Sequence, residues 1–187
     1  MKNPFLIGDT IYLRPLEHED ASLIQPWVND PDVSRFLLVH LPMNKQVEER
    51  FIDAMSRSEN DIVLVIVRIQ DDVPVGLTGF HQIQQKNRNA VFGINIGDKE
   101  CWGQGYGTEA TGLMMQFAFD KLNLNRITLH VFEFNDRAHH VYKKLGFQEE
   151  GVLRQDHYCE GQYWDTIIMG MLRDEWRELM LASQGTV

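Results

Sequence analysis

Three glycines at alternate positions form the first candidate site of the chain. They are Gly103, Gly105 and Gly107, within the stretch WGQGYGTEA at residues 102–110, and a helix-like pattern follows them. Glycine has no Cβ, so an anion can come close to the backbone amides, and the unpaired N–H groups and dipole of a helix N-terminus favour negative charge. The stretch therefore indicates an anion site, although taken alone it also fits a tight turn that binds nothing.

Two well-known phosphate loops do not match this stretch. A Walker loop needs Gly-Lys-Ser/Thr, and no Lys follows these glycines. A dinucleotide fold needs repeated βαβ units and a G-x-G-x-x-G spacing, whereas the spacing here is G-x-G-x-G and the preceding strands read as an antiparallel meander.

Two further motifs make the stretch specific. Residues 93–110 (GINIGDKECWGQGYGTEA), 135–147 (NDRAHHVYKKLGF) and 161–176 (GQYWDTIIMGMLRDEW) resemble, in order and spacing, the GNAT N-acetyltransferase family. The resemblance is closest to its branch of ribosomal-protein N-terminal acetyltransferases and spermidine acetyltransferases. It implies an α+β fold, the GNAT acyl-CoA N-acyltransferase fold, with a mixed, mostly antiparallel central sheet and helices on both faces. We expect one such domain over residues 1–187.

The resemblance also implies acetyl-CoA as co-substrate, with no metal. The pyrophosphate would lie on the turn amides, and the pantetheine arm would pair with residues 94–96, where one amide would hold the oxyanion. Trp102 stands where the family usually has Gln or Arg, a variation associated with this branch. The implied cofactor-binding residues of these two segments are Ile94, Asn95, Ile96, Trp102, Gln104, Gly105, Tyr106, Gly107 and Thr108.

The second motif contains a capping residue and a tyrosine. Asn135 is a good helix N-cap, and in the family the same Asn also contacts the pantetheine. Tyr142 follows about two turns later, and the resemblance makes it the general acid, since a phenol with a pKa of about 10 can protonate a departing thiolate. A half-buried core tyrosine is the structural alternative. Ala138 is small enough to let the cofactor pass, while Arg137 and Lys144 fit either nucleotide phosphates or solvated helix charges.

The general base is not identified by the resemblance. Many branch members have a Glu two residues before the Gly of the fourth strand. In this chain that Gly is Gly93, and Val91 stands in place of the Glu. His81, Glu133 or a relayed water remain as alternatives. Adjacent His139 and His140 point about 100° apart on a helix, so we expect no metal site there.

The acceptor pocket is expected from the first helices and the last hairpin, as in the family. Trp27, Phe36 and Tyr158 are its candidate residues, together with His81. Each of them also fits ordinary packing or a surface position.

The elements that position these residues can be predicted from apolar spacing, caps and turns. We expect Pro26 to kink or divide the first helix, a loop over 30–42, and an antiparallel meander of the three middle strands. The predicted strands are 10–13, 62–70, 75–82, 90–96, 126–134, 152–158 and 163–171, and the predicted helices are 17–29, 44–56, one beginning at Thr108, 135–145 and 174–181.

Composition narrows the class of protein. The chain has 187 residues, 43% hydrophobic and 24% charged, which fits a soluble domain with a real core. No signal peptide or membrane-spanning run is recognisable, and Cys101 and Cys159 fit a reducing cytosol. A formal net charge of −9 argues against a nucleic-acid surface. We therefore expect a cytoplasmic protein without nucleic-acid or membrane partners, and a homodimer stays open.

The expected function is transfer of acetyl from acetyl-CoA to a primary amine by direct attack in a ternary complex. The acceptor stays open between a protein N-terminus, a polyamine or other small amine, and an aminoglycoside-like amino sugar. An acetyl-CoA-binding regulatory module without turnover is the non-enzyme alternative, because Val91 replaces the branch carboxylate.

Overall fold

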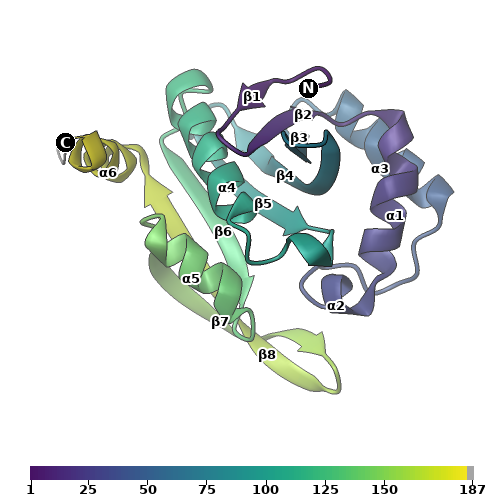
Figure 1. Cartoon of the computed structure of the whole chain (residues 1–187). Helices are drawn as coiled ribbons and strands as arrows, with labels where there is room; N and C mark the ends of the chain where they lie inside the picture. The colour runs from purple at the N-terminus through teal and green to yellow at the C-terminus, as the bar shows by residue number, and fades with distance from the viewer. Residues whose placement is uncertain (185–187) are drawn as a thin grey trace. The chain divides into compact units, whose positions relative to one another are not determined.

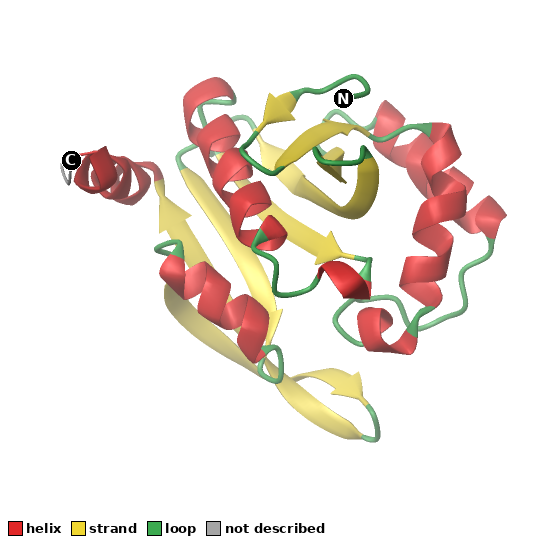
Figure 2. Cartoon of the chain, in the orientation of Figure 1, coloured by secondary structure: helices red, strands yellow, loops and turns green. Residues whose placement is uncertain are grey.

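The structure, a computed structural model, describes residues 1–184 and divides into two compact units. Unit 1 comprises Met1–Gln82 and Gly93–Met114, and unit 2 comprises Ile83–Phe92 and the chain from Met115 on. Figure 1 labels the helices and strands of both units, and Figure 2 distinguishes the two classes by colour. The chain crosses from one unit to the other inside two strands and one helix. That the chain is a single domain stays a prediction.

Unit 1 contains an antiparallel sheet. Its strands are β1 (Leu6–Ile7), β2 (Ile11–Pro15), β3 (Ile62–Arg68) and β4 (Val73–Gln84), each paired with the next. β5 (Asn89–Ile96) follows β4 in the strand order. The Thr78 hydroxyl donates to the Gly93 carbonyl, and the Gly97 N–H donates to the Val75 carbonyl, so β4 and β5 run in opposite directions. The predicted meander is therefore confirmed.

Two helices of unit 1 pack against each other, and a short helix lies between them in the sequence. α1 (Ala21–Asn29) lies against α3 (Lys45–Arg57), and Ala21, Ile24 and Ile52 form the buried cluster between them. The Asn44 side chain accepts from the Val47 N–H at 3.1 Å, so the predicted cap is confirmed.

Two details of this helical region differ from the sequence prediction. The first helix begins with a 3-10 turn at His18–Asp20 and then continues as α1 through Pro26, without dividing there. The expected loop contains α2 (Pro31–Ser34), because Asp30 caps it and Pro31 occupies its first position, where a missing N–H costs nothing.

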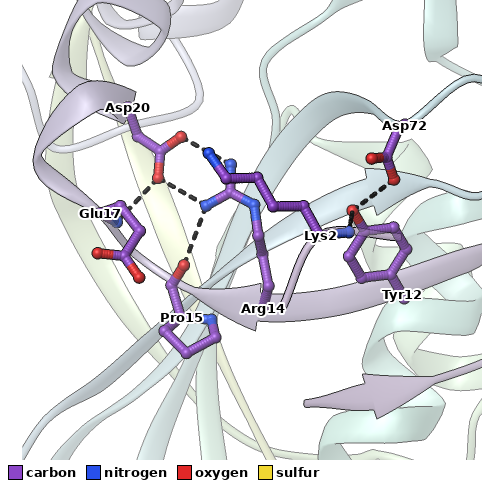
Figure 3. A network of polar contacts seen from close by, with 7 residues as sticks. All are labelled: Lys2, Tyr12, Arg14, Pro15, Glu17, Asp20 and Asp72. Atoms are coloured by element: carbon purple, nitrogen blue, oxygen red, sulfur yellow. Dashed lines mark hydrogen bonds and ion pairs between the residues drawn. The ribbon is translucent and has the colours of Figure 1, made fainter. Parts of the chain in front are cut away.

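A buried ion pair joins the sheet of unit 1 to its first helical turn. The Arg14 guanidinium donates to both carboxylate oxygens of Asp20, at 2.8 and 2.7 Å, and Asp20 also accepts the Glu17 N–H (Figure 3). The two side chains are only 9% and 8% exposed. Water therefore cannot replace the carboxylate if it is removed.

Asp20→Ala is expected to lower the free energy of unfolding by about 3 kcal/mol, because it leaves the Arg14 charge buried and unpaired. Chemical denaturation measures the change. Asp53→Ala is the control, since Asp53 pairs with His18 at 2.9 Å on the exposed surface and its loss should change the stability little. Equal losses in the two variants would contradict this account of the buried pair.

Unit 2 is built on a mixed sheet. The first half of β5 pairs in parallel with β6 (Arg126–Phe132), from Asn89↔Arg126 to Val91↔Thr128. β8 (Gln162–Leu172) pairs antiparallel with β6 and with β7 (Gln148–Cys159). The turn between β7 and β8 has positive φ at Glu160 (53°) and Gly161 (86°), as expected for a type I′ hairpin turn. The predicted final hairpin is confirmed.

The remaining helices are α4, α5 and α6. α4 (Tyr106–Gln116) follows the glycines and continues as a π-helical turn over Phe117–Lys121. α5 (Asp136–Lys144) lies between β6 and β7 in the chain, and α6 (Arg173–Gln184) ends the described chain.

Candidate active site

The glycine turn of unit 1 leaves open space at its backbone. Gly103 and Gly105 have φ of +75° and +88°, a left-handed conformation that other residues adopt only with strain. A Cβ added at either position would meet no atom within 4 Å. α4 begins at Tyr106, two residues before the predicted Thr108, so Gly107 already lies in its first turn. The arrangement fits an anion bound at a helix N-terminus.

Side-chain contacts hold this turn beside the end of β5. The Trp102 indole N–H donates to the Ile96 carbonyl at 2.7 Å, and the Phe36 ring lies edge-on to Trp102 at 6.3 Å. Gln104 donates to the Glu100 carbonyl at 2.6 Å. Trp102 thus links the two cofactor-binding segments that the family resemblance implies.

Residues 94–96 are half-buried in β5. The ladder of β5 with β6 ends at Val91↔Thr128, so Ile94, Asn95 and Ile96 lie beyond its last pair. That they bind the cofactor arm stays a prediction.

In unit 2, Asn135 caps the helix that contains Tyr142. The Asn135 side chain accepts the Ala138 N–H at 3.2 Å, which confirms its capping role. Because a cap uses the amide oxygen as acceptor, the NH₂ group remains available to a ligand.

A helix-ending motif fixes the position of Tyr142. The Phe147 N–H donates to the Tyr142 carbonyl, and the Gly146 N–H donates to the Lys143 carbonyl, both at 3.0 Å. With Gly146 at φ +94°, this is a Schellman motif. Its apolar contact is the edge-on packing of Tyr142 on Phe147, with ring centroids 5.9 Å apart. The local sequence YKKLGF therefore holds the phenol in place.

The Tyr142 phenol is buried and remains protonated. Its side chain is largely covered, with the residue 7% exposed, and burial raises its pKa to about 12. Within the described residues, no group forms a hydrogen bond with its hydroxyl. The hydroxyl proton of Tyr142 is therefore not donated to any side chain of the described residues.

The other charged residues of α5 have different surroundings. Lys144 is exposed. His139 and Lys143 both contact Glu149, at 2.8 and 2.7 Å, so His139 belongs to a surface ion cluster. No group of three or more His, Cys, Asp or Glu side chains that could hold a metal occurs in residues 1–184.

The candidate acceptor residues fall in both units. In unit 1, Trp27 packs on the cluster between α1 and α3, and its ring occupies the space where a Gly97 Cβ would lie. Phe36 lies against Trp102, as described above. In unit 2, Tyr158 is 62% exposed and lies edge-on to Tyr163 at 5.0 Å. Their role in an acceptor pocket stays a prediction.

The base candidates also differ in their partners. His81, on β4, lies 3.0 Å from Asp61. Glu133 is exposed and accepts the Asp165 N–H at 3.3 Å. Val91 is half-buried in the β5–β6 ladder. Of the candidate bases, His81 has a carboxylate partner.

Sequence reasoning missed His157 of β7. Its ring stacks on Phe132, with centroids 3.8 Å apart, and Trp164 and Phe134 complete the aromatic cluster. Burial lowers the pKa of His157, so the ring is neutral near pH 7. The pairing of β7 with β8 shifts register between Leu153 and His157, and no sequence pattern signalled that shift.

The family model of the acetyltransferase (GNAT) domain matches residues 10–148. The chain therefore belongs to the GNAT acetyltransferase family and is an acetyl-CoA-dependent N-acetyltransferase. The family and enzyme class predicted from the motifs are confirmed.

Similar proteins include both activities of the predicted branch. The spermidine N(1)-acetyltransferase of Escherichia coli K12 is 32% identical over 168 residues, covering 89% of this chain and 88% of that protein. A putative ribosomal N-acetyltransferase of Bacillus subtilis is 34% identical over 101 residues, covering 54% of this chain and 55% of that protein. The structure of spermidine N-acetyltransferase from Vibrio cholerae with CoA and spermine superposes with a TM-score of 0.85 at 26% identity, covering 91% and 99% of the two chains. The predicted α+β GNAT fold is confirmed.

Among the described helices, none has the length and apolar character needed to cross a membrane.

Proposed function

We propose that the chain acetylates a primary amine of a polyamine or a similar small aliphatic amine. The observation that carries this proposal is the match of 89% of the chain to the spermidine N(1)-acetyltransferase of Escherichia coli. The related Vibrio cholerae enzyme, whose structure contains CoA and spermine, supports the same acceptor class. A formal net charge of −9 is compatible with a cationic acceptor.

We assign the donor side of the site as follows. The amides of residues 104–108 bind the pyrophosphate of acetyl-CoA, because the turn leaves open space beside a helix N-terminus. Residues 94–96 pair with the pantetheine arm, and one of their N–H groups stabilises the oxyanion. Trp102 holds these two segments together. Asn135, Ala138 and Lys144 complete the cofactor-binding set.

Tyr142 is the proposed general acid. The amine attacks the thioester carbon directly in a ternary complex, without a covalent enzyme intermediate or a metal. The N–C bond forms, the C–S bond breaks, and Tyr142 protonates the departing thiolate. Burial of the phenol supports this role because it keeps the proton on Tyr142 at neutral pH.

A protein N-terminal amine is the second candidate acceptor. The similarity to a putative ribosomal N-acetyltransferase favours it, although that similarity covers 54% of the chain. An amino sugar is kept as an outcome of the acceptor assay. An acetyl-CoA-binding module without turnover is also kept, because Val91 replaces the carboxylate of the branch.

Acetyl-CoA is expected to raise the melting temperature of the protein. A ligand at about 100 times its Kd stabilises the folded state by about 2.7 kcal/mol, which corresponds to roughly 5–11 °C for a chain of this size. Differential scanning fluorimetry measures the shift, and ATP at equal concentration serves as the control. No shift at saturating acetyl-CoA would contradict the enzyme and the binding-module readings alike.

An acceptor panel separates the candidate functions. Release of free CoA thiol is measured with spermidine, a peptide carrying a free N-terminus, and an amino sugar. We expect turnover with spermidine. Turnover with the peptide but not with spermidine would instead favour acetylation of protein N-termini. Inactivity with all three acceptors would favour the binding module.

We further propose a single cytoplasmic domain without a nucleic-acid partner, in keeping with the negative charge and with free Cys101 and Cys159. A homodimer is included in this proposal, and light scattering determines the mass in solution.

A further inference from the structure

A histidine–carboxylate pair lies in unit 1, outside the donor-binding segments. The His81 Nδ1 atom on β4 lies 3.0 Å from Asp61 Oδ1, just before β3. The histidine side chain is 38% exposed and the aspartate side chain 24% exposed. The pair is therefore partly shielded and still open to a small molecule.

Two further hydrogen bonds hold the Asp61 carboxylate in place. The Ser58 hydroxyl donates to Oδ2 at 2.6 Å, and the Gln82 N–H donates to Oδ1 at 3.3 Å. The hydrogen bond from Ser58 is the largest cause that lowers the pKa of Asp61, followed by those from His81 and Gln82. Asp61 is thus ionised near neutral pH and can only accept hydrogen bonds.

The ionised carboxylate determines the tautomer of His81. Since Asp61 only accepts, the hydrogen of neutral imidazole lies on Nδ1, and Nε2 carries the free lone pair. Within residues 1–184, Asp61 is the only charged group that hydrogen-bonds or ion-pairs with His81. The pair thus presents a proton acceptor at Nε2.

The Nε2 edge of His81 faces Gly93 on β5. A Cβ added to Gly93 would lie 3.7 Å from both Nε2 and Cδ2 of His81. Gly93 directly precedes residues 94–96, and at about 3.3 Å per residue it lies roughly 10 Å from Ile96. Trp102 holds the glycine turn beside Ile96. A pantetheine arm that runs from this turn along residues 96 to 94 therefore ends near Gly93. The acyl group is carried at that end of the arm.

We propose that His81, oriented by Asp61, is the general base of acetyl transfer, an inference that rests on the proposed function. Nε2 takes a proton from the acceptor ammonium, directly or through one water, and the neutral amine attacks the thioester carbon. The N–C bond forms as the C–S bond breaks, and the thiolate receives its proton from Tyr142. The attacking nitrogen loses its second proton to solvent as the amide forms, Tyr142 regains a proton from solvent, and His81 returns its proton to solvent, so each turnover releases one proton net.

This assignment explains how the chain functions with Val91 in place of the branch carboxylate. The competing carboxylate, Glu133, is exposed and accepts the Asp165 N–H. His81 by contrast has its acceptor atom free and lies beside the strand that we assign to the thioester.

His81→Gln is expected to lower kcat with spermidine by about 100-fold or more, while the melting shift with acetyl-CoA persists. The deficit should shrink as pH rises, because more of the amine is then already neutral. Asp61→Asn, which changes the partner of Nδ1, should lower kcat by about tenfold, with the KM for acetyl-CoA unchanged. The matched control is His18→Gln, since His18 forms a similar pair with Asp53 on the exposed surface of the same unit.

Each outcome decides the assignment. Wild-type turnover in His81→Gln would overturn it, and so would a loss of the acetyl-CoA melting shift parallel to the loss of rate, which indicates damage to the fold. A deficit of equal size at every pH would also count against a base. Failure of the proposed function is seen separately, in the wild-type protein, as no acetyl-CoA shift or no turnover with spermidine, and the assignment then falls with it.

Discussion

Tyr142→Phe is expected to lower kcat by about 10²–10⁴-fold and to leave acetyl-CoA affinity within about twofold. The substitution removes the hydroxyl, while the ring keeps its edge-on packing against Phe147 and the Schellman motif keeps its backbone bonds. Since no described side chain hydrogen-bonds with that hydroxyl, the fold loses little. Steady-state kinetics and calorimetric titration with acetyl-CoA measure the two quantities.

The raised pKa of Tyr142 has a consequence for the pH profile. A phenol with a pKa of about 12 is a weaker acid than an ordinary tyrosine, but it stays protonated throughout the range of the assay. A thiolate formed in an equally dry site is also destabilised, so its own pKa rises and proton transfer stays close to balanced. We therefore expect no loss of wild-type rate between about pH 7 and pH 10 from titration of Tyr142.

Tyr163→Phe is the matched control, because Tyr163 is 62% exposed on the final hairpin. Its kcat should equal that of the wild type. An unchanged kcat in Tyr142→Phe would remove Tyr142 from the mechanism, and a large loss of acetyl-CoA affinity would make it a binding residue instead.

Local signals in the sequence predicted the features that depend on neighbouring residues. Asn135 and Gly146 defined the two ends of α5, and Glu160-Gly161 defined the last turn, because caps and tight turns are set by a few adjacent side chains. The glycines at 103–107 likewise predicted the strand-to-helix turn. The start of α4 moved by two residues, within the usual uncertainty of helix ends.

Long-range features could not be predicted in the same way. Asp61 is 20 residues from His81 in sequence, and no periodicity indicates that the two meet across β3 and β4. His157 is half-buried against Phe132 of β6 and follows a register shift in β7, and both are tertiary properties. Glu48 on α3 is buried, and burial raises the pKa of its carboxyl, a property that depends on the elements packed against the helix.

Gly107→Asp is expected to raise the Kd for acetyl-CoA by about 10³-fold, or about 4 kcal/mol. The new carboxylate would lie at the second position of α4, where we place the pyrophosphate, and two like charges about 4 Å apart repel by about 4 kcal/mol at an effective dielectric constant of 20. The fold should not suffer, because an acidic residue in the first helical turn is favoured by about 0.3–1 kcal/mol. An added Cβ at Gly107 meets only Ile96, at an ordinary 3.7 Å.

Two further variants separate charge, bulk and helix stability. Gly107→Ala adds the Cβ without the charge and should raise the Kd by roughly tenfold. Gly112→Asp adds the same charge to the same helix, where an added Cβ meets nothing within 4 Å, and should leave the Kd unchanged. Calorimetric titration gives the three Kd values, and thermal melting without ligand reports the fold. If Gly107→Asp binds acetyl-CoA as tightly as Gly112→Asp does, the pyrophosphate does not lie on this turn, because no fixed anion could tolerate a carboxylate at that distance.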